Sequence, residues 1–300
     1  MACCAFLAST AAAGFSSSGK GTSSGEFLKI GQGARALALG EAYTALADDA
    51  LALNWNPAGL ARVPHISVVL AHTAYLESVN YEYAAAALKL SILGAVGASV
   101  QHQSVGDVTQ RDNTGLQTGS FSPKDGAYTL GYAHNLGVLC VGLSAKYIDS
   151  KLADSATGMA VDAGIQTGPL LGDRFRLGAT AANIGGKLKY DKASNDLPVT
   201  YRVGASASLT EGWVISSDVI LPRDNKPIVA VGTEFGLALA GHWRLTPRFG
   251  YNTRSAGDVE GFTGFSAGLG FGLRKLSVDY ALVPLGDLGL THRFSLSFRL

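Results

Sequence analysis

Few residues in this sequence have the types and spacing that catalysis or cofactor binding requires. Residues Gly31–Ala36 read GQGARA, which matches the glycine pattern of a dinucleotide-binding turn. No alternation of strands and helices follows, so glycines in a turn before a helix are the simpler interpretation. The six histidines, at positions 65, 72, 102, 134, 242 and 292, show no metal-ligand spacing. We therefore expect no cofactor, no metal ion and no enzyme activity.

Cys140 and a set of single charged residues are the next candidates. Cys140 falls between apolar positions of an alternating stretch, where a small buried filler is the expected role. Charged residues alternate with apolar ones in the same way, among Gly and Ser, along many such stretches. We assign nine of them to an enclosed interior: Lys146, Asp162, Arg176, Arg202, Asp218, Glu234, Arg248, Asp279 and Arg293. Buried charges need partners, so we expect the pairs Lys146–Asp162, Asp162–Arg176, Arg202–Asp218, Glu234–Arg248 and Asp279–Arg293.

The composition favours a β-rich chain with many tight turns. Charged residues make up 16% of the 300 residues, against about 25% in typical soluble domains. The 38 glycines are about 13% of the chain, against roughly 7% on average. A net charge of +1 gives no reason to expect nucleic-acid binding. The sequence contains no run of about 18 apolar residues, so it predicts no transmembrane helix. The strands of a membrane barrel would escape this test, because their apolar residues alternate with polar ones.

The first residues resemble an export signal. Residues 1–24 are small and apolar up to Lys20, and Ala11–Ala13 offer a cleavage site. A disordered tail is the alternative. Cys3 and Cys4 would leave with a cleaved signal, so only Cys140 would remain and no intramolecular disulfide is expected.

Residues 25–62 are the only helical region. They are rich in Ala and Leu, and Gly40 with the pair Asp48-Asp49 predicts two short helices with a break between them. Asn56-Pro57 ends the second helix, because proline cannot continue one, and Gly59 lets the chain turn away.

From Ile66 onward the apolar period changes to two. The last eight residues, RFSLSFRL, alternate polar and apolar side chains to the end of the chain. We predict 14 strands, centred near residues 70, 85, 98, 129, 142, 163, 179, 204, 217, 232, 247, 268, 279 and 295. Short connections near residues 135, 211 and 274 alternate with long polar ones at 105–124, 149–157, 185–197 and 252–261. This alternation is typical of an outer-membrane barrel, with long loops outside and short turns in the periplasm.

Two architectures are compatible with strands of this kind. In a soluble sandwich the apolar face would point inward, whereas in a membrane barrel it would meet lipid. Gly and Ser on the polar face favour a confined interior, and Trp213, Trp243 and Tyr128 on the apolar face suit an interfacial girdle. We expect an all-β protein, a 14-stranded antiparallel transmembrane barrel.

Several stretches of the sequence resemble the PorV/PorQ family of bacterial outer-membrane proteins. They are FLKIGQGARALALGEAYTALADDALALNWNPAGLA, ANIGG, GFSAGLGF and SVDYALVPLGDLGLTHRFSLSF, within residues 25–300. The family is similar to FadL-type barrels, which carry an N-terminal hatch with an Asn-Pro-Ala motif. The resemblance implies a hatch at residues 25–64, with the motif Asn56, Pro57, Ala58 and Gly59, and a barrel at residues 65–300.

The resemblance leaves two main functions open. One is a partner role in type IX-like protein export or surface attachment, with secretion-system proteins or exported cargo as partners. The other is FadL-like transport of hydrophobic molecules across the outer membrane, and an unassigned porin-like barrel is a third possibility. Independently of the family, the alternating C-terminal residues Phe294, Leu296, Phe298 and Leu300 offer a strand for an assembly machine, and we predict that they form the insertion signal.

Overall fold

The computed structural model describes residue 15 and residues 19–75, 79–152, 154–172, 174–190, 193–254 and 261–300. Most of the predicted leader at residues 1–24 lies outside this range, including Cys3, Cys4 and Ala11–Ala13. No helix in the described part of the chain is long and apolar enough to cross a membrane.

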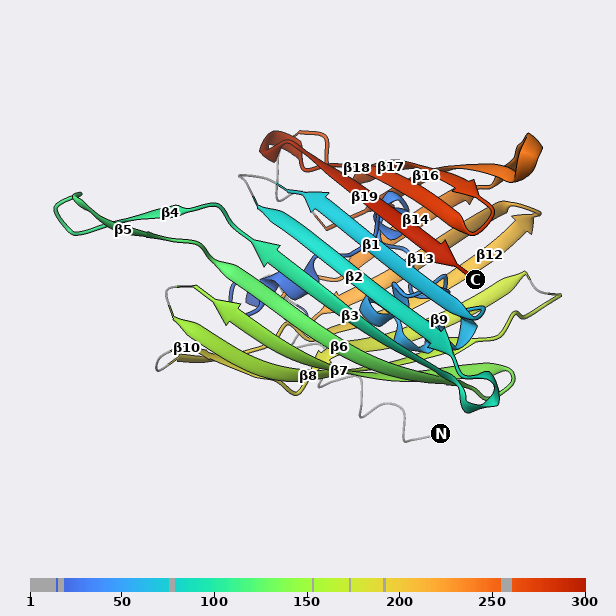
Figure 1. Ribbon diagram of the computed structural model, residues 1–300, viewed down its shortest axis with the longest axis horizontal. Coiled ribbons are helices and arrows are strands. Elements are labelled where there is room, and N and C mark those ends of the chain that lie inside the picture. The colour runs from blue at the N-terminus through green and yellow to red at the C-terminus, as the bar shows by residue number, and fades with distance from the viewer. Residues whose placement is uncertain are drawn as a thin grey trace.

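Fourteen strands form one closed antiparallel barrel (Figure 1). The strands of the first half are β1 (Ile66–Ala74), β2 (Asn80–Lys89), β3 (Ala95–Ser104), β6 (Lys124–Asn135), β7 (Leu139–Lys151), β8 (Ser155–Thr167) and β9 (Phe175–Ile184). Those of the second half are β12 (Thr200–Thr210), β13 (Trp213–Pro222), β14 (Ile228–Phe235), β16 (Trp243–Asn252), β17 (Phe265–Leu273), β18 (Leu276–Pro284) and β19 (Leu290–Arg299). Every predicted strand is present, which confirms the fold class.

The barrel closes where the first and last strands meet. β1 pairs with β19 in register from Ser67–Arg299 to Ala74–His292. β14 pairs directly with β16, and the short strand β15 (Leu237–Ala238) pairs with the start of β16. Every strand of the barrel therefore has a hydrogen-bonded neighbour on both sides, as a membrane barrel requires.

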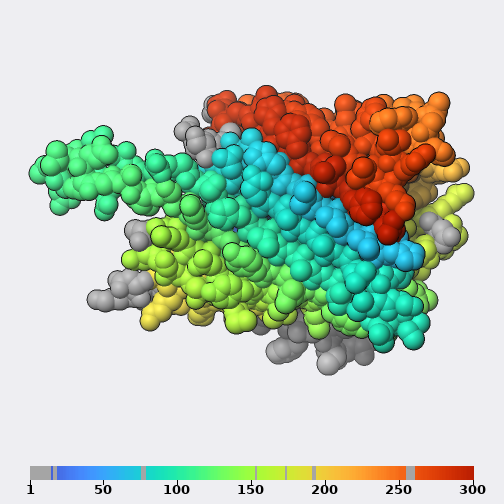
Figure 2. Space-filling model, viewed as in Figure 1, coloured from blue at the N-terminus to red at the C-terminus, as the bar shows by residue number. Residues whose placement is uncertain are grey.

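The connections separate into two rims. The short-turn rim carries the links after β2, β6, β8, β12, β14 and β17, together with the C-terminus. The long-loop rim carries the links after β1, β3, β7, β9, β13, β16 and β18, and two of these contain strands of their own. The hairpin of β4 (Val108–Arg111) and β5 (Gln117–Phe121) projects far beyond the barrel (Figure 2). The second hairpin pairs β10 (Lys187–Tyr190) with β11 (Ala193–Asp196).

Apolar residues face outward on strand after strand. Leu130, Leu143 and Phe294 are 69%, 59% and 48% exposed, while their neighbours Thr129, Ser144 and Arg293 are buried. Trp213, Trp243 and Tyr128 also point outward. An apolar outer face around a polar interior is the arrangement of a membrane barrel and the reverse of a soluble sandwich.

The N-terminal chain enters the barrel before β1 begins. It forms η2 (Glu26–Lys29), α2 (Ala34–Ala38), α3 (Ala52–Trp55) and η3 (Pro57–Arg62), and we call residues 25–63 the inner segment. No residue from 27 to 63 is exposed, although its two α-helices have only five and four residues. So short a chain of helical turns is stabilised by packing against the wall rather than by helix propensity.

Candidate functional site in the barrel interior

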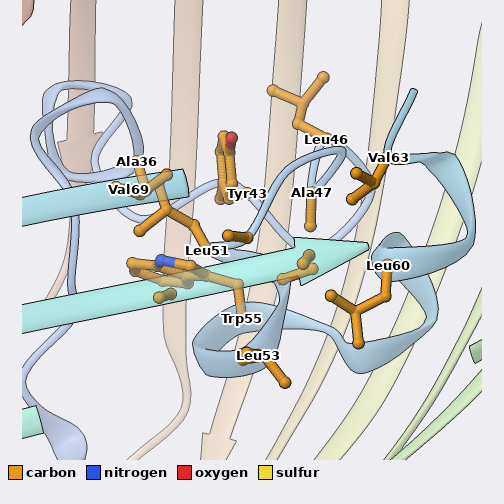
Figure 3. Close-up of a cluster of buried hydrophobic side chains, with 14 of the residues drawn as sticks. Ala36, Tyr43, Leu46, Ala47, Leu51, Leu53, Trp55, Leu60, Val63 and Val69 are labelled. Atoms are coloured by element: carbon orange, nitrogen blue, oxygen red, sulfur yellow. The ribbon is translucent and has the colours of Figure 1, made fainter. Parts of the chain in front are cut away.

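The inner segment has an apolar core of its own. Trp55 and Tyr43 pack edge to face with ring centroids 5.9 Å apart, and Leu51 lies beside them (Figure 3). The indole Nε1 of Trp55 donates to the backbone oxygen of Gln32 at 2.9 Å. Gly31 and Gly33, from the dinucleotide-like motif, lie where a Cβ would come within 2.7 Å of Trp55 and 2.5 Å of Leu51. Close packing of the inner segment therefore explains these glycines.

Asn56 joins the inner segment to the barrel wall. Its side chain is fully buried, and its Nδ2 donates to the backbone oxygens of Thr44 at 2.9 Å and of Ile165 on β8 at 3.0 Å. Its Oδ1 accepts from the amide of Ala58 at 3.2 Å and so caps η3, with Pro57 in the first turn. One side chain thus organises a helix start, a turn of the inner segment and a strand of the wall.

Inward-facing glycines let the backbone of the inner segment touch the wall. A Cβ on Gly142 would lie 2.3 Å from the carbonyl carbon of Pro57, and one on Gly164 would lie 2.1 Å from Oδ1 of Asn56. Gly250 on β16 lies as close to Gly40. Other inward glycines in close contact with the inner segment are Gly97, Gly131, Gly178, Gly232 and Gly268. Eight of the 38 glycines therefore serve this contact.

Gln166 is a wall residue that the sequence did not single out. It is fully buried on β8, and its Nε2 donates to the backbone oxygens of Ala45 at 2.8 Å and Ala47 at 3.2 Å. Its Oε1 accepts from Nε of Arg62. The period of two places Gln166 inward, but nothing in the sequence indicates that it binds the backbone of another segment.

Two of the predicted charge pairs form across adjacent strands. Nζ of Lys146 lies 2.8 Å from Asp162, and both side chains are buried. Nε of Arg248 lies 3.0 Å from Glu234. Asp162 also accepts a hydrogen bond from the backbone amide of Asn183 at 2.8 Å, which further offsets the cost of removing its carboxylate from water.

Other predicted pairs are replaced by different contacts. Oδ2 of Asp218 accepts from the amides of Tyr43 and Thr44 and from the Thr44 hydroxyl, while Arg202 lies 3.4 Å from Glu41. These two predicted partners are thus bound separately by the inner segment.

Asp279 also binds a partner other than the predicted Arg293. It accepts from Nη1 of Arg248 at 2.6 Å, and the Arg293 guanidinium lies 5.7 Å from the centre of the Tyr75 ring. Among the described residues Arg176 makes no ion pair with Asp162. The expected pairs Arg202–Asp218, Asp279–Arg293 and Asp162–Arg176 were therefore wrong, because the prediction considered only neighbouring strands.

Charges of the inner segment complete the network. Arg35 lies 2.7 Å from Glu234 and 3.0 Å from Asp48. Arg299, near the end of β19, lies 3.2 Å from Asp48 and 2.6 Å from Asp49. The ion pairs link the inner segment to β14 and to the strand that closes the barrel.

The start of the inner segment and the residues just before it are also attached to the long-loop rim. Lys29 lies 2.7 Å from Asp224 in the β13–β14 turn, which also accepts from the Ser23 hydroxyl. Burial opposes ionisation of Asp224, but these donors hold the pKa of its carboxyl below the ordinary value. The amide of Ser24 donates to Asp196 at 3.0 Å. Ser23 and Ser24, which fall within the predicted leader and tail at residues 1–24, thus contact the barrel.

A family model described as type IX secretion system protein PorV matches residues 17–240. The chain belongs to the PorV family. Among curated protein sequences, none matches it.

Solved structures with the same fold are hydrocarbon and FadL-like barrels. The Pseudomonas putida toluene transporter TodX has a TM-score of 0.60 at 14% identity, covering 89% of this chain and 96% of that one. The CymD monoaromatic hydrocarbon channel has a TM-score of 0.60 at 12% identity, covering 90% and 98%. A Pseudomonas aeruginosa FadL homologue has a TM-score of 0.51 at 9% identity, covering 89% and 97%. At these identities the similarity shows the fold, which agrees with an outer-membrane location.

The histidines and Cys140 were the other candidates for chemistry in this PorV-family barrel. No group of three or more His, Cys, Asp or Glu side chains there is arranged to hold a metal ion. Cys140 points inward and packs among the apolar residues of the inner segment and the wall. The interior is a set of binding contacts between one segment and its barrel.

The predicted insertion residues lie on the lipid-facing side of the last strand. Phe294 and Leu296 are 48% and 44% exposed on β19, with Phe298 half-buried on the same face. Leu300 follows the strand, and its backbone oxygen accepts from the amide of His65 at 2.9 Å. The role of these residues in insertion stays a prediction.

Proposed function

We propose that this protein is a non-enzymatic outer-membrane barrel that acts as a partner in type IX-like protein export or surface attachment. The observation that carries the proposal is the family match over residues 17–240, whose description names a type IX secretion system protein. Outer-membrane lipids surround the barrel, and secretion-system proteins or exported cargo are its proposed partners.

We further propose that the inner segment is a hatch that closes the lumen, with Asn56, Pro57, Ala58 and Gly59 as its anchoring motif. The support is its burial, the hydrogen bonds of Asn56 to β8 and the close glycine contacts with the wall. A barrel of 14 strands is wider than the eight-stranded barrels that side chains alone can fill, so an inserted segment is needed to block it.

The β4–β5 hairpin supplies surface for such a partner. Residues 106–120 are exposed apart from one half-buried position, and the hairpin projects beyond the rim (Figure 2). Its turn is ordered by Asp112, whose Oδ1 accepts from the amides of Thr114 at 2.8 Å and Leu116 at 3.0 Å. Hydrogen bonds from Thr114 lower the pKa of Asp112 from its ordinary value. Two paired strands with free edges can accept a further strand from a partner.

Chemical crosslinking in outer membranes tests the export proposal. A tagged protein expressed in a bacterium with type IX secretion should co-purify with a secretion-system protein or an exported cargo. Replacing residues 106–122 by a short Gly-Ser turn should reduce this recovery, while a hairpin of scrambled sequence and equal length controls for bulk. Loss of the protein should also reduce the surface display of exported proteins. Unchanged display together with an absence of crosslinked partners would reject the role.

The alternative is passage of hydrophobic small molecules. It is favoured by the agreement in fold with TodX, a toluene transporter, and CymD, a monoaromatic hydrocarbon channel. Uptake of labelled toluene by cells with and without the protein tests it directly. Faster uptake that depends on an intact inner segment would favour transport, and uptake equal to that of cells lacking the protein would reject it.

A further inference from the structure

A polar cavity of about 380 Å³ opens on the short-turn rim, below the inner segment. Its wall is made by the ends of β12, β14, β17 and β19 and the starts of β9, β13, β16 and β18. Arg35, Asp48 and Asp49 of the inner segment form its inner boundary. In outer-membrane barrels the short turns lie in the periplasm, so the cavity faces that compartment.

The charged residues deep in this cavity form ion pairs with one another. Arg248 lies between Glu234 at 3.0 Å and Asp279 at 2.6 Å, and Arg35 lies 2.7 Å from Glu234. Arg299 contacts Asp48 and Asp49 as described above. Three arginines and four carboxylates therefore form one connected network that needs no further ligand.

The charges nearer the rim are not balanced in this way. Arg176 on β9 and Arg244 on β16 also line the cavity, and within the described residues neither has a carboxylate partner. With Arg174 included, six arginines face four carboxylates, which leaves two positive charges in excess. This excess of positive charge favours the binding of an anion.

The wall is shaped to accommodate an arginine side chain. A Cβ on Gly236 would come within 2.3 Å of Nη2 and 2.7 Å of Nε of Arg244, so the guanidinium lies against bare backbone there. Small polar residues also line the wall, including Ser206, Ser208 and Ser297. Space and hydrogen-bond donors therefore surround the two arginines that lack carboxylate partners.

We propose that this cavity is a binding site for an oxyanion, a carboxylate or phosphate group that enters from the periplasm and is held by Arg176 and Arg244. Guanidinium groups bind both kinds of oxyanion through paired N–H donors. The volume lies within the range of small-molecule sites. The site goes beyond the proposed functions and does not depend on which of them holds.

Calorimetric titration of the purified protein in uncharged detergent at low ionic strength tests the site. Inorganic phosphate and succinate are the two probes, and glycerol is the neutral control. The wild type should bind at least one probe at millimolar concentration, and the double variant Arg176→Gln, Arg244→Gln should lose about tenfold or more in affinity, because each change removes charge-assisted hydrogen bonds. The matched control Arg111→Gln, Arg223→Gln removes two arginines from the long-loop rim and should bind as the wild type does.

A third variant separates geometry from net charge. Gly236→Ala keeps every arginine but pushes the flexible end of Arg244 away from the wall, so it should weaken binding while the control variant does not. Binding of phosphate alone or of succinate alone identifies the group that the site prefers, and either result supports the proposal. The proposal is overturned if the wild type binds neither probe, or if the arginine double variant and its control bind equally well.

Discussion

The two halves of the barrel wall hold the inner segment by different physical means. On β1 to β9 the inward residues are mostly small or apolar. The backbone of η3 lies against Gly142, the side chain of Asn56 lies against Gly164, and the side chain of Leu60 lies against Gly97. On β12 to β19 the inner segment is held largely by charge, through Asp218, Glu234 and Arg299. The first half acts by shape, which tolerates little added volume, and the second by a network in which partners can be exchanged.

Each half of the wall also contains contacts of the kind that dominates the other half. The buried pair Lys146–Asp162 lies on β7 and β8, and Gly250 and Gly268 make close contacts on β16 and β17. Lys146 and Asp162 bind each other, whereas Glu234 binds both the wall and Arg35. What distinguishes the second half is that its charges contact the inner segment directly.

β19 joins the two halves, so its loss should have the largest effect. It pairs with β1 on one side and β18 on the other, and Arg299 holds Asp48 and Asp49. Deleting residues 291–300 should abolish insertion and leave no heat-modifiable barrel in gel electrophoresis. Deleting residues 106–122, a larger piece outside the barrel ladder, should leave heat modifiability intact. A normal barrel in the C-terminal deletion would show that neither closure nor the insertion signal requires this strand.

Removing the inner segment should have the next largest effect. Deleting residues 25–62 takes away the contacts of both halves while leaving all 14 strands. We expect a large rise in single-channel conductance in planar bilayers, because the lumen of a barrel this wide is not filled by wall side chains. Replacing residues 106–122 by a short turn serves as the control and should leave conductance low. If the deletion protein assembles with unchanged conductance, the inner segment does not close the lumen.

Adding a methyl group to the shape-dependent half should loosen one anchor. A Cβ at position 142 or 164 would collide with Pro57 or Asn56, where the obstacle at Gly142 is backbone and cannot swing away. Gly142→Ala and Gly164→Ala should each cost about 1–3 kcal/mol in inner-segment docking, the usual range for overpacking. Protease sensitivity of the inner segment and channel noise would report the loosening.

Gly126→Ala is the matched control for these variants. It is a glycine on the outer face of β6, away from the inner segment, and an added Cβ would come no closer than 3.6 Å to the ring of Tyr128, which is ordinary contact. It should behave as the wild type. Equal effects at positions 126, 142 and 164 would contradict the view that the first half holds the inner segment by shape.

The same comparison explains which parts could be predicted from the sequence. The strands were predictable because a barrel strand between lipid and lumen keeps a strict period of two. The β4–β5 hairpin was missed because a hairpin exposed on both faces, with Val108 and Leu116 in water, has no such pattern. A strand shows alternating apolar and polar residues only where one of its faces is buried.

The site was less predictable because its partners lie far apart in sequence. Lys146–Asp162 was predicted correctly, since adjacent strands place these residues together and their charges are complementary. Asp218 was assigned to the wrong partner because the amides of Tyr43 and Thr44 compete for it, and backbone donors leave no trace in residue type. Glycine on the polar face indicated a confined lumen, but only the fold shows that Gly164 makes room for Asn56.

Breaking one ion pair in the charged half should have the smallest effect, because each member has other partners. Arg35 keeps Asp48 and the Tyr43 hydroxyl when Glu234 is changed, and Glu234 keeps Arg248 when Arg35 is changed. Arg35→Gln and Glu234→Gln should therefore each loosen docking by less than Gly142→Ala. Together they should show a coupling energy of about 0.5–3 kcal/mol, as residues in one network do. The test is a double-mutant cycle. For the wild type, the two single variants and the double variant, it measures the temperature at which protease begins to cut the inner segment. Additive effects would mean that the Arg35–Glu234 contact contributes nothing to docking, and that the second half, like the first, depends on shape.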